Sequence, residues 1–132
     1  MTLTSEEKND IIQYRIEKSL QALKEARDNI SMDNWNLAVN RLYYATFYMA
    51  IAVNLSKGET AKSHSGVFSI IAKNYIATGI MSKEAGALYR KLFSMRQTGD
   101  YDDLFDWTEE DVLPLLNPTE SLIASMRELI KI

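Results

Sequence analysis

Hydrophobic side chains follow a helical period through most of this chain, and they are densest between Asp33 and Leu55. Arg41 is the only charged side chain between Asp33 and Lys57. Apolar residues recur there at alternating spacings of four and three, which places on one helical stripe Ala38, Leu42, Ala45, Met49 and Ala52. The alanines of this stripe would let another helix approach closely. Because the other faces are also largely apolar, the pattern predicts a helix at the centre of a bundle or at a subunit interface.

The segment before it predicts a long amphipathic helix. Thr4 and Glu7 have the spacing of a capping box, and the helix is expected to run to about Ile30. Its inner stripe is predicted to contain Ile12, Ile16, Leu20 and Leu23. Its other faces carry many charges, which are typical of a solvated surface. Asp33 is expected to cap the central helix, and Gly58 follows its end.

Two shorter helices are predicted after a polar loop. The third should occupy about 65–77 and stop at Thr78-Gly79. The fourth should begin after Ser82, and Gly99 is expected to end it in the left-handed conformation. An acidic loop then carries Asp100, Asp102, Asp103 and Asp106.

The C-terminal region is predicted to be helical but interrupted. Thr108 and Asp111 form a second capping box at the start of the helical region 109–131. A kink or break is expected between Pro114 and Pro118, with Asn117 as the cap of a terminal helix. No strand-like alternation or repeat appears. The fold class is therefore all-α, an up-and-down bundle of about five helices in one domain spanning 1–132.

Composition excludes several classes of function. The chain has no cysteine and a single histidine, which rules out disulfides, thiolate metal sites and histidine pairs. Its glycines stand apart, so there is no phosphate-binding loop, and we expect neither metal nor cofactor. The net charge of −3 limits any nucleic-acid binding to a local patch. The N-terminus lacks a signal-peptide pattern and no segment is apolar enough to span a membrane, so we expect a cytoplasmic protein.

Lys62, His64 and Ser65 form the first candidate site, at the predicted start of the third helix. The free N–H groups and positive dipole of a helix N-terminus favour an anion there, and Lys62 adds positive charge. The alternative is structural, because a lone histidine before a helix more often makes a structural hydrogen bond, and serine is a common cap.

Arg96, Asp100 and Tyr101 form the second candidate site, at the end of the fourth helix. Arg96 could pair with Asp100 in a structural role, since a cation there also complements the helix dipole. A bundle could bring these residues to His64 and to the polar face of the central helix, which carries Arg41 and Tyr44. We expect Arg41 to be largely buried or at a cleft wall, held by a carboxylate such as Asp100 or by carbonyl groups.

Three stretches of the sequence resemble, in order and spacing, the signature stretches of small stand-alone HEPN-domain proteins. They are AVNRLYYATFYMA, KSHSGVFSIIAKNYIATG and LFSMRQTGDYDD, and the similarity extends from about Asp10 to Ile132. The resemblance implies a bundle of four or five helices that commonly forms homodimers. It also implies a prokaryotic source and a small nucleotidyltransferase as partner, often in a toxin–antitoxin pair.

The resemblance further implies ribonuclease chemistry, but the sequence departs from that motif. Many HEPN proteins cleave RNA without metal, using an arginine followed four to six residues later by a histidine. Here Arg96 is followed by Asp100-Tyr101, and the sole histidine, His64, lies on another predicted helix. Arginine can stabilise a phosphate but cannot transfer protons at neutral pH. Related toxins carry a tyrosine that the partner modifies, and Tyr101 is the nearest counterpart.

We therefore expect a homodimeric binding or regulatory module for a nucleotide or an RNA end. Two alternatives remain: a ribonuclease that uses His64 with Arg96 and Tyr101, and a purely structural homodimer whose polar cluster braces the bundle. They differ in whether His64 and Arg96 face each other across an open cleft or are buried in satisfied hydrogen bonds.

Overall fold

The computed structural model describes residues 3–131. Met1, Thr2 and Ile132, which the single-domain expectation includes, lie outside the described residues. Within residues 3–131 every regular element is a helix, which confirms the all-α class. No helix in this part of the chain has the length and hydrophobicity needed to cross a membrane.

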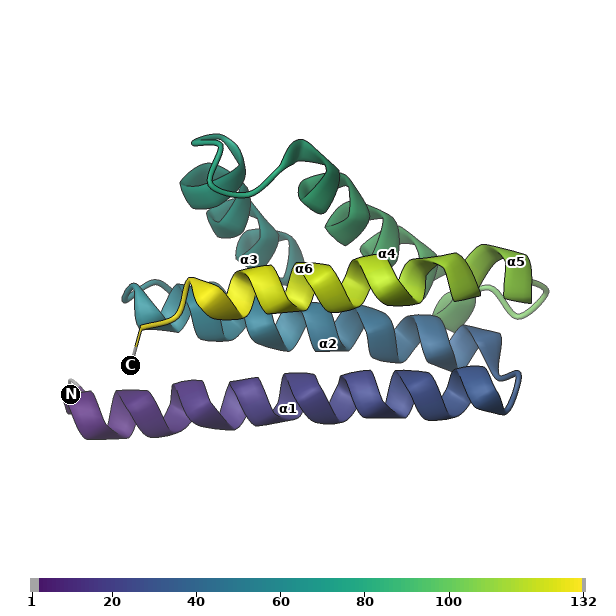
Figure 1. Ribbon diagram of the computed structural model, residues 1–132, viewed down its shortest axis with the longest axis horizontal. Helices are drawn as coiled ribbons and strands as arrows, with labels where there is room; N and C mark the ends of the chain where they lie inside the picture. The colour runs from purple at the N-terminus through teal and green to yellow at the C-terminus, as the bar shows by residue number, and fades with distance from the viewer. Residues whose placement is uncertain (1–2, 132) are drawn as a thin grey trace.

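The elements follow the order of the predicted helices. They are α1 (Ser5–Ser31), α2 (Trp35–Ser56), α3 (His64–Ile71) with a π-helical turn (Ala72–Ile76), α4 (Lys83–Tyr101), α5 (Glu109–Val112), a 3₁₀ turn (Leu113–Leu115) and α6 (Leu116–Glu128). Helix α2 runs beside α1 and α6, whereas α3 and α4 form an arm that leans away from this layer (Figure 1). Helix α2 contacts each of the other α-helices, as its apolar pattern predicts.

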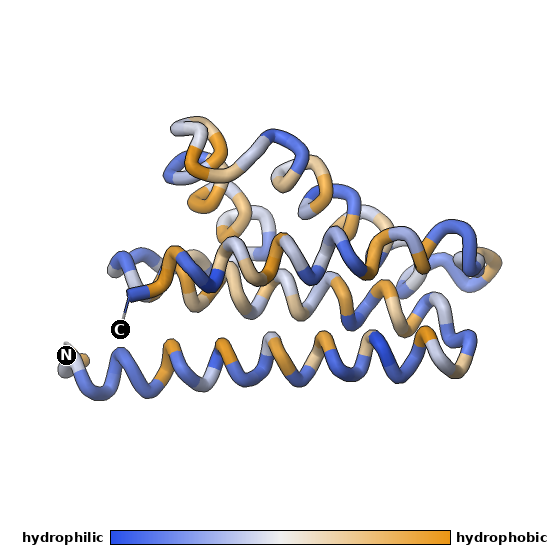
Figure 2. Tube along the Cα trace, in the orientation of Figure 1, coloured by the Kyte–Doolittle hydropathy of each residue, from blue (hydrophilic) through white to orange (hydrophobic). Residues whose placement is uncertain are grey.

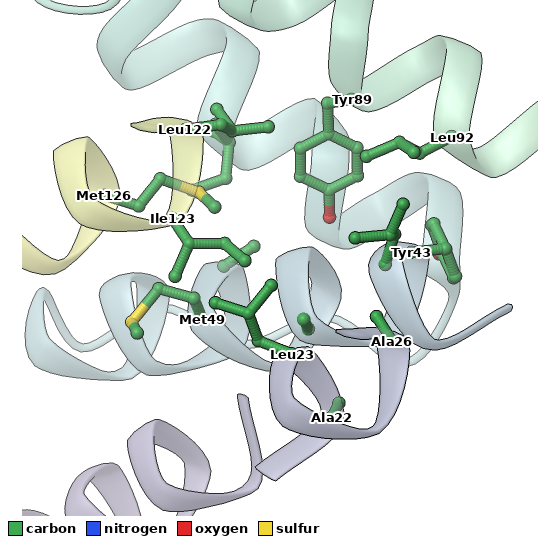
Figure 3. Close-up of a cluster of buried hydrophobic side chains, with 14 of the residues drawn as sticks. Ala22, Leu23, Ala26, Tyr43, Met49, Tyr89, Leu92, Leu122, Ile123 and Met126 are labelled. Atoms are coloured by element: carbon green, nitrogen blue, oxygen red, sulfur yellow. The ribbon is translucent and has the colours of Figure 1, made fainter. Parts of the chain in front are cut away.

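The core is built around the predicted stripe of α2. Ala38, Leu42, Ala45, Met49 and Ala52 are all fully buried. Figure 3 shows Met49 and Tyr43 of α2 among side chains from α1, α4 and α6. Where α1 packs on α2, the Ser19 hydroxyl donates a hydrogen bond of 2.6 Å to the Ala45 carbonyl. Such a contact requires close helices, and the small side chains of Ala22 and Ala26 on α1 permit it.

Several predicted helix ends are confirmed in atomic detail. The Thr4–Glu7 capping box is present at the start of α1, and the Thr108–Asp111 box at the start of α5. The Ser82 hydroxyl accepts a hydrogen bond of 3.1 Å from the Ala85 N–H and caps α4. These side chains satisfy backbone donors that have no partner within the helix.

Two expectations about α1 and α2 are wrong. Leu20 is 40% exposed, because Ser19 occupies the inner face and replaces it at the contact with α2. Figure 2 shows α1 as mostly hydrophilic with regularly spaced hydrophobic bands. Asp33 does not cap α2: it has a φ of 59°, in the left-handed region, and turns the chain between the helices. The N-cap position belongs to Asn34, whose side chain makes no capping hydrogen bond.

Gly99 was expected to end α4, but the helix continues to Tyr101. Glycine at this position instead allows Trp107 to approach the helix closely, because a Cβ on Gly99 would lie 3.2 Å from Nε1 of Trp107. That indole nitrogen donates to the Met95 carbonyl and fixes the returning loop against α4. Gly79, in contrast, has a φ of 82° and stops the third helical segment as expected.

The C-terminal interruption lies at Pro114, one turn earlier than the predicted cap at Asn117. A short 3₁₀ segment contains Pro114, and α6 starts directly after it at Leu116, so Asn117 is inside the helix. Pro118 is tolerated in the first turn of α6, where its missing N–H has no helical partner to lose.

Candidate functional site

His64 is held against α2 by a hydrogen bond and by ring stacking. It is the first residue of α3, where the Ser63 hydroxyl accepts a hydrogen bond from the Gly66 N–H and caps the helix. Nδ1 of His64 lies 2.7 Å from the Tyr43 hydroxyl. The imidazole also stacks on Phe47, with the ring centroids 4.2 Å apart and the planes within 9°. His64 therefore makes a structural hydrogen bond, which is one of the two roles predicted for it.

Burial shifts the pKa values of both groups toward their uncharged forms. It raises the pKa of the Tyr43 phenol, which stays protonated at neutral pH, and the direction of the Tyr43–Nδ1 hydrogen bond then depends on the His64 tautomer. Burial, and then the nearby Arg96 charge, lower the pKa of His64 below its usual 6.5. A neutral imidazole that accepts at Nδ1 carries its own proton on Nε2. Within residues 3–131 Nε2 makes no hydrogen bond, so in this tautomer it is a donor available to a ligand.

Arg96 lies beneath the aromatic rings and is only 6% exposed. Its guanidinium carbon is within 6.0 Å of four ring centroids, those of Tyr43, Tyr44, Phe93 and Tyr101. Nη1 of Arg96 lies 3.9 Å from Oδ2 of Asp100. Nε of Arg96 is buried and has no hydrogen-bond partner among the described residues. The positive charge is thus stabilised mainly by aromatic faces and only weakly neutralised.

Arg41 belongs to a second network that joins α1, α2 and α4. It pairs with Glu25 at 3.2 Å, and not with Asp100 as expected. Its guanidinium also donates to the Asn40 side-chain oxygen, while the Asn40 amide donates to Asp100 at 2.9 Å. Arg41 is half-buried rather than largely buried, and the carboxylate that holds it is Glu25.

A small pocket opens between α3 and α4 beside His64. Its volume is about 110 Å³, and it is lined by His64, Ser65, Phe68, Tyr89, Arg90 and Phe93. Arg90 is exposed and lies over the Phe68 ring at 5.2 Å. Its walls are mainly aromatic, and the Arg90 guanidinium, the Ser65 hydroxyl and the His64 imidazole border it. At this volume the pocket suits a small anion or the end of a larger ligand.

The structure brings most of the predicted site residues together. Tyr44, His64, Arg96, Asp100 and Tyr101 meet in or beside one cluster, and Arg41 contacts it through Tyr44, with its guanidinium 5.3 Å from that ring. Ser65 lines the pocket. Lys62 is exposed and does not line the pocket; it lines a different groove beside His64.

Sequence reasoning missed Tyr43, Phe47, Phe93 and Arg90. Tyr43 and Phe47 are four residues apart in α2, and Arg90 and Phe93 are three apart in α4, so each pair shares a helix face. That spacing is a usable signal once the two faces are known to meet. No group of three histidine, cysteine, aspartate or glutamate side chains that could hold a metal ion occurs among the described residues.

The lowered pKa of His64 predicts a pH-dependent stability. Between its folded pKa and 6.5 the unfolded chain binds more protons, so the free energy of unfolding should fall as pH is lowered through this window. His64 is the only histidine, so the His64→Asn variant should lose this dependence. Thermal denaturation at a series of pH values from about 7 to about 5.5 measures it. If the stability of wild type and of His64→Asn changed with pH in the same way, the lowered pKa of His64 would be contradicted.

Comparisons with known proteins agree with this architecture. Residues 12–129 match the model of the HEPN domain. A UPF0332 protein of Thermotoga maritima is 34% identical over 125 residues, which cover 95% of each chain. "Putative toxin MJ0142" of Methanocaldococcus jannaschii is 32% identical over 102 residues, covering 77% of this chain and 69% of the relative.

A solved structure shows the same fold at low sequence identity. The crystal structure of TT1696 from Thermus thermophilus superposes with a TM-score of 0.76 and covers 90% of this chain and 98% of its own. Its identity of 14% limits the comparison to the fold. The domain match spans nearly all of the helical core, and the first relative covers almost the whole chain. This protein therefore belongs to the HEPN-domain family.

Proposed function

We propose that this protein is a HEPN-family binding and regulatory module whose ligand is a nucleotide or an RNA end. The observation that carries the proposal is the donor set of the pocket beside His64: the Nε2 proton of His64, the Ser65 hydroxyl and the Arg90 guanidinium. Each donates hydrogen bonds, and Arg90 adds a full positive charge, so the set favours phosphate oxygens. Phe68 and Phe93 offer faces on which a base can stack.

The same geometry supports binding over cleavage. Cleaving RNA without metal requires one group that accepts the 2′-hydroxyl proton and another that donates a proton to the leaving oxygen. Nδ1 of His64 is occupied by the Tyr43 hydroxyl, and the proposal places the imidazole proton on Nε2. Arg96 is covered by aromatic rings and does not line the pocket. The pocket thus offers donors without an adjacent base.

Binding can be measured with a fluorescent short RNA that ends in a phosphate, using ADP as competitor. Arg90→Ala should weaken binding about tenfold, the usual effect of losing one charged hydrogen bond. Lys91→Ala is the matched control, because Lys91 is exposed on α4 and does not line the pocket. Binding should also weaken with added salt.

Electrophoresis of the same RNA after incubation separates the proposal from its enzymatic alternative. The RNA should remain intact. Rapid cleavage that is lost in His64→Ala would support the ribonuclease instead. Binding that is equal in wild type, Arg90→Ala and Lys91→Ala would place the ligand elsewhere.

A homodimer is part of the proposal and gives a separate prediction. Large apolar side chains remain exposed on α1 and α2, with Tyr14 at 53% and Leu37 at 57%. The outer side of α2 adds partly buried Tyr44 and Tyr48. Covering such a surface is typical of stable subunit interfaces. Light scattering at micromolar concentration should give twice the chain mass, and a mass of 15.1 kDa would contradict the dimer.

The proposed protein partner is a small nucleotidyltransferase in a toxin–antitoxin-like pair. Two observations support it: the relatives include proteins named as putative toxins, and Tyr101 is 75% exposed beside the His64 cluster. Copurification of this chain with a tagged small nucleotidyltransferase from the same organism tests the pairing. Failure of the two proteins to copurify when coexpressed would remove this part of the proposal.

A further inference from the structure

A larger groove lies on the α1 side of His64, distinct from the pocket between α3 and α4. Its volume is about 420 Å³, within the range of ligand sites. It is bounded by α1, the second half of α2 and the segment leading into α3. Apolar side chains that line it are Ile11, Phe47, Ile51, Leu55 and Val67. The groove can therefore accept an apolar group.

Asn54 gives this groove a specific polar requirement. The residue is only 3% exposed, and its amide nitrogen donates to the Val67 carbonyl at 3.3 Å. Its Oδ1 is buried and accepts no hydrogen bond from any described residue. Buried acceptors are normally satisfied, so this oxygen fits a ligand that brings an N–H or O–H donor.

Arg15 and Lys62 give the groove a positive balance. Arg15 is half-buried, and its Nε has no hydrogen-bond partner in the described part of the chain. Lys62 is exposed at the groove, and neither cation forms a salt bridge within residues 3–131. The carboxylate in the lining, Glu59, accepts a hydrogen bond from Asn74, and the His64 imidazole is neutral. Two cations thus face one carboxylate.

We propose that this groove binds the carboxyl terminus of a partner peptide whose last residue is apolar. The terminal carboxylate would pair with Arg15 and Lys62, the last amide N–H would donate to Oδ1 of Asn54, and the final side chain would lie on Phe47 and Ile51. A fully ionised phosphate monoester group has only oxygen acceptors, so that group itself gains nothing from Oδ1 of Asn54. A fatty acid brings the carboxylate and the tail but no N–H.

The test uses small probes of the peptide terminus. Isothermal titration should show that acetyl-alanyl-leucine binds, and that its C-terminal amide binds at least about tenfold more weakly. Arg15→Gln should weaken binding of the acid about tenfold and leave the weak binding of the amide unchanged. Lys18→Gln is the matched control, because Lys18 is exposed on the same helix and does not line the groove. Lys62→Gln, which changes an exposed side chain, should also weaken binding and guards against a folding defect in Arg15→Gln.

Each alternative outcome overturns the proposal in a recognisable way. Equal binding of acid and amide would show that the cations are not used. If decanoate bound as tightly as the peptide, Asn54 would not be used and the ligand would be a simple fatty acid. If AMP bound as tightly as the peptide, the groove would be an extension of the nucleotide site. No binding of the acid at millimolar concentration would exclude a peptide terminus altogether.

Discussion

Replacing Arg96 with alanine is expected to lower the free energy of unfolding by about 2–4 kcal/mol, the range of large-to-small substitutions in protein cores. Arg96 is 6% exposed and fills the space between α2 and α4. Its removal leaves a cavity lined by rings and abolishes the attraction between the guanidinium and those rings. Urea denaturation of wild type and variant measures the loss.

Arg96→Met separates the volume of this side chain from its charge. Methionine fills similar space, and the buried guanidinium is weakly neutralised because Asp100 is 3.9 Å away. Replacing such a charge with an apolar group of similar volume is often neutral, so Arg96→Met should cost less than half as much as Arg96→Ala. Arg90→Ala, at an exposed position, should change stability by no more than about 0.5 kcal/mol. A methionine variant as unstable as the alanine variant would show that the charge, not the packing, stabilises the cluster.

Ala45→Leu should destabilise the protein by about 1–3 kcal/mol or more, because it adds volume where the core has no room. Ala45 is fully buried, and its carbonyl accepts the 2.6 Å hydrogen bond from Ser19 of α1. A leucine side chain would force the two helices apart and lengthen that bond. The thermal midpoint of unfolding reports the change.

Ala124→Leu is the matched control for this substitution. Ala124 is exposed on α6, so the same added volume meets solvent and should shift stability by about 0.5 kcal/mol or less. Equal effects at both positions would show that the contact of α1 with α2 is not tightly packed. Ser19→Ala should add a smaller loss, of about 0.5–1.5 kcal/mol, since it removes a single hydrogen bond.

The helices and many of their ends could be predicted because their causes are local. The stripe of α2 and the capping boxes depend on residues within a turn or two of each other. Leu20 and Gly99 were misjudged because tertiary contacts decide their roles. Ser19 takes the inner face in place of Leu20 by bonding to Ala45, and Gly99 allows the close approach of Trp107 instead of ending the helix.

The candidate site was predicted in part for the same reason. The sequence marks Arg96 and His64 as unusual, but it does not show which faces of α2, α3 and α4 meet. Tyr43 could not be chosen over Tyr44 without that information, although Tyr43 makes the hydrogen bond to His64. The pairing of Arg41 with Glu25 also depends on the contact of α1 with α2, which brings together residues distant in sequence.

The most direct test of the proposed function is proton–nitrogen correlation NMR of the His64 ring in the untagged protein. His64 is the only histidine, so one imidazole is observed. At neutral pH it should be uncharged with its proton on Nε2, and Nε2 should shift when a short RNA ending in a phosphate is added, while the RNA stays intact. An imidazole protonated at Nδ1, an Nε2 signal unmoved at saturating RNA, or cleaved RNA would contradict the account.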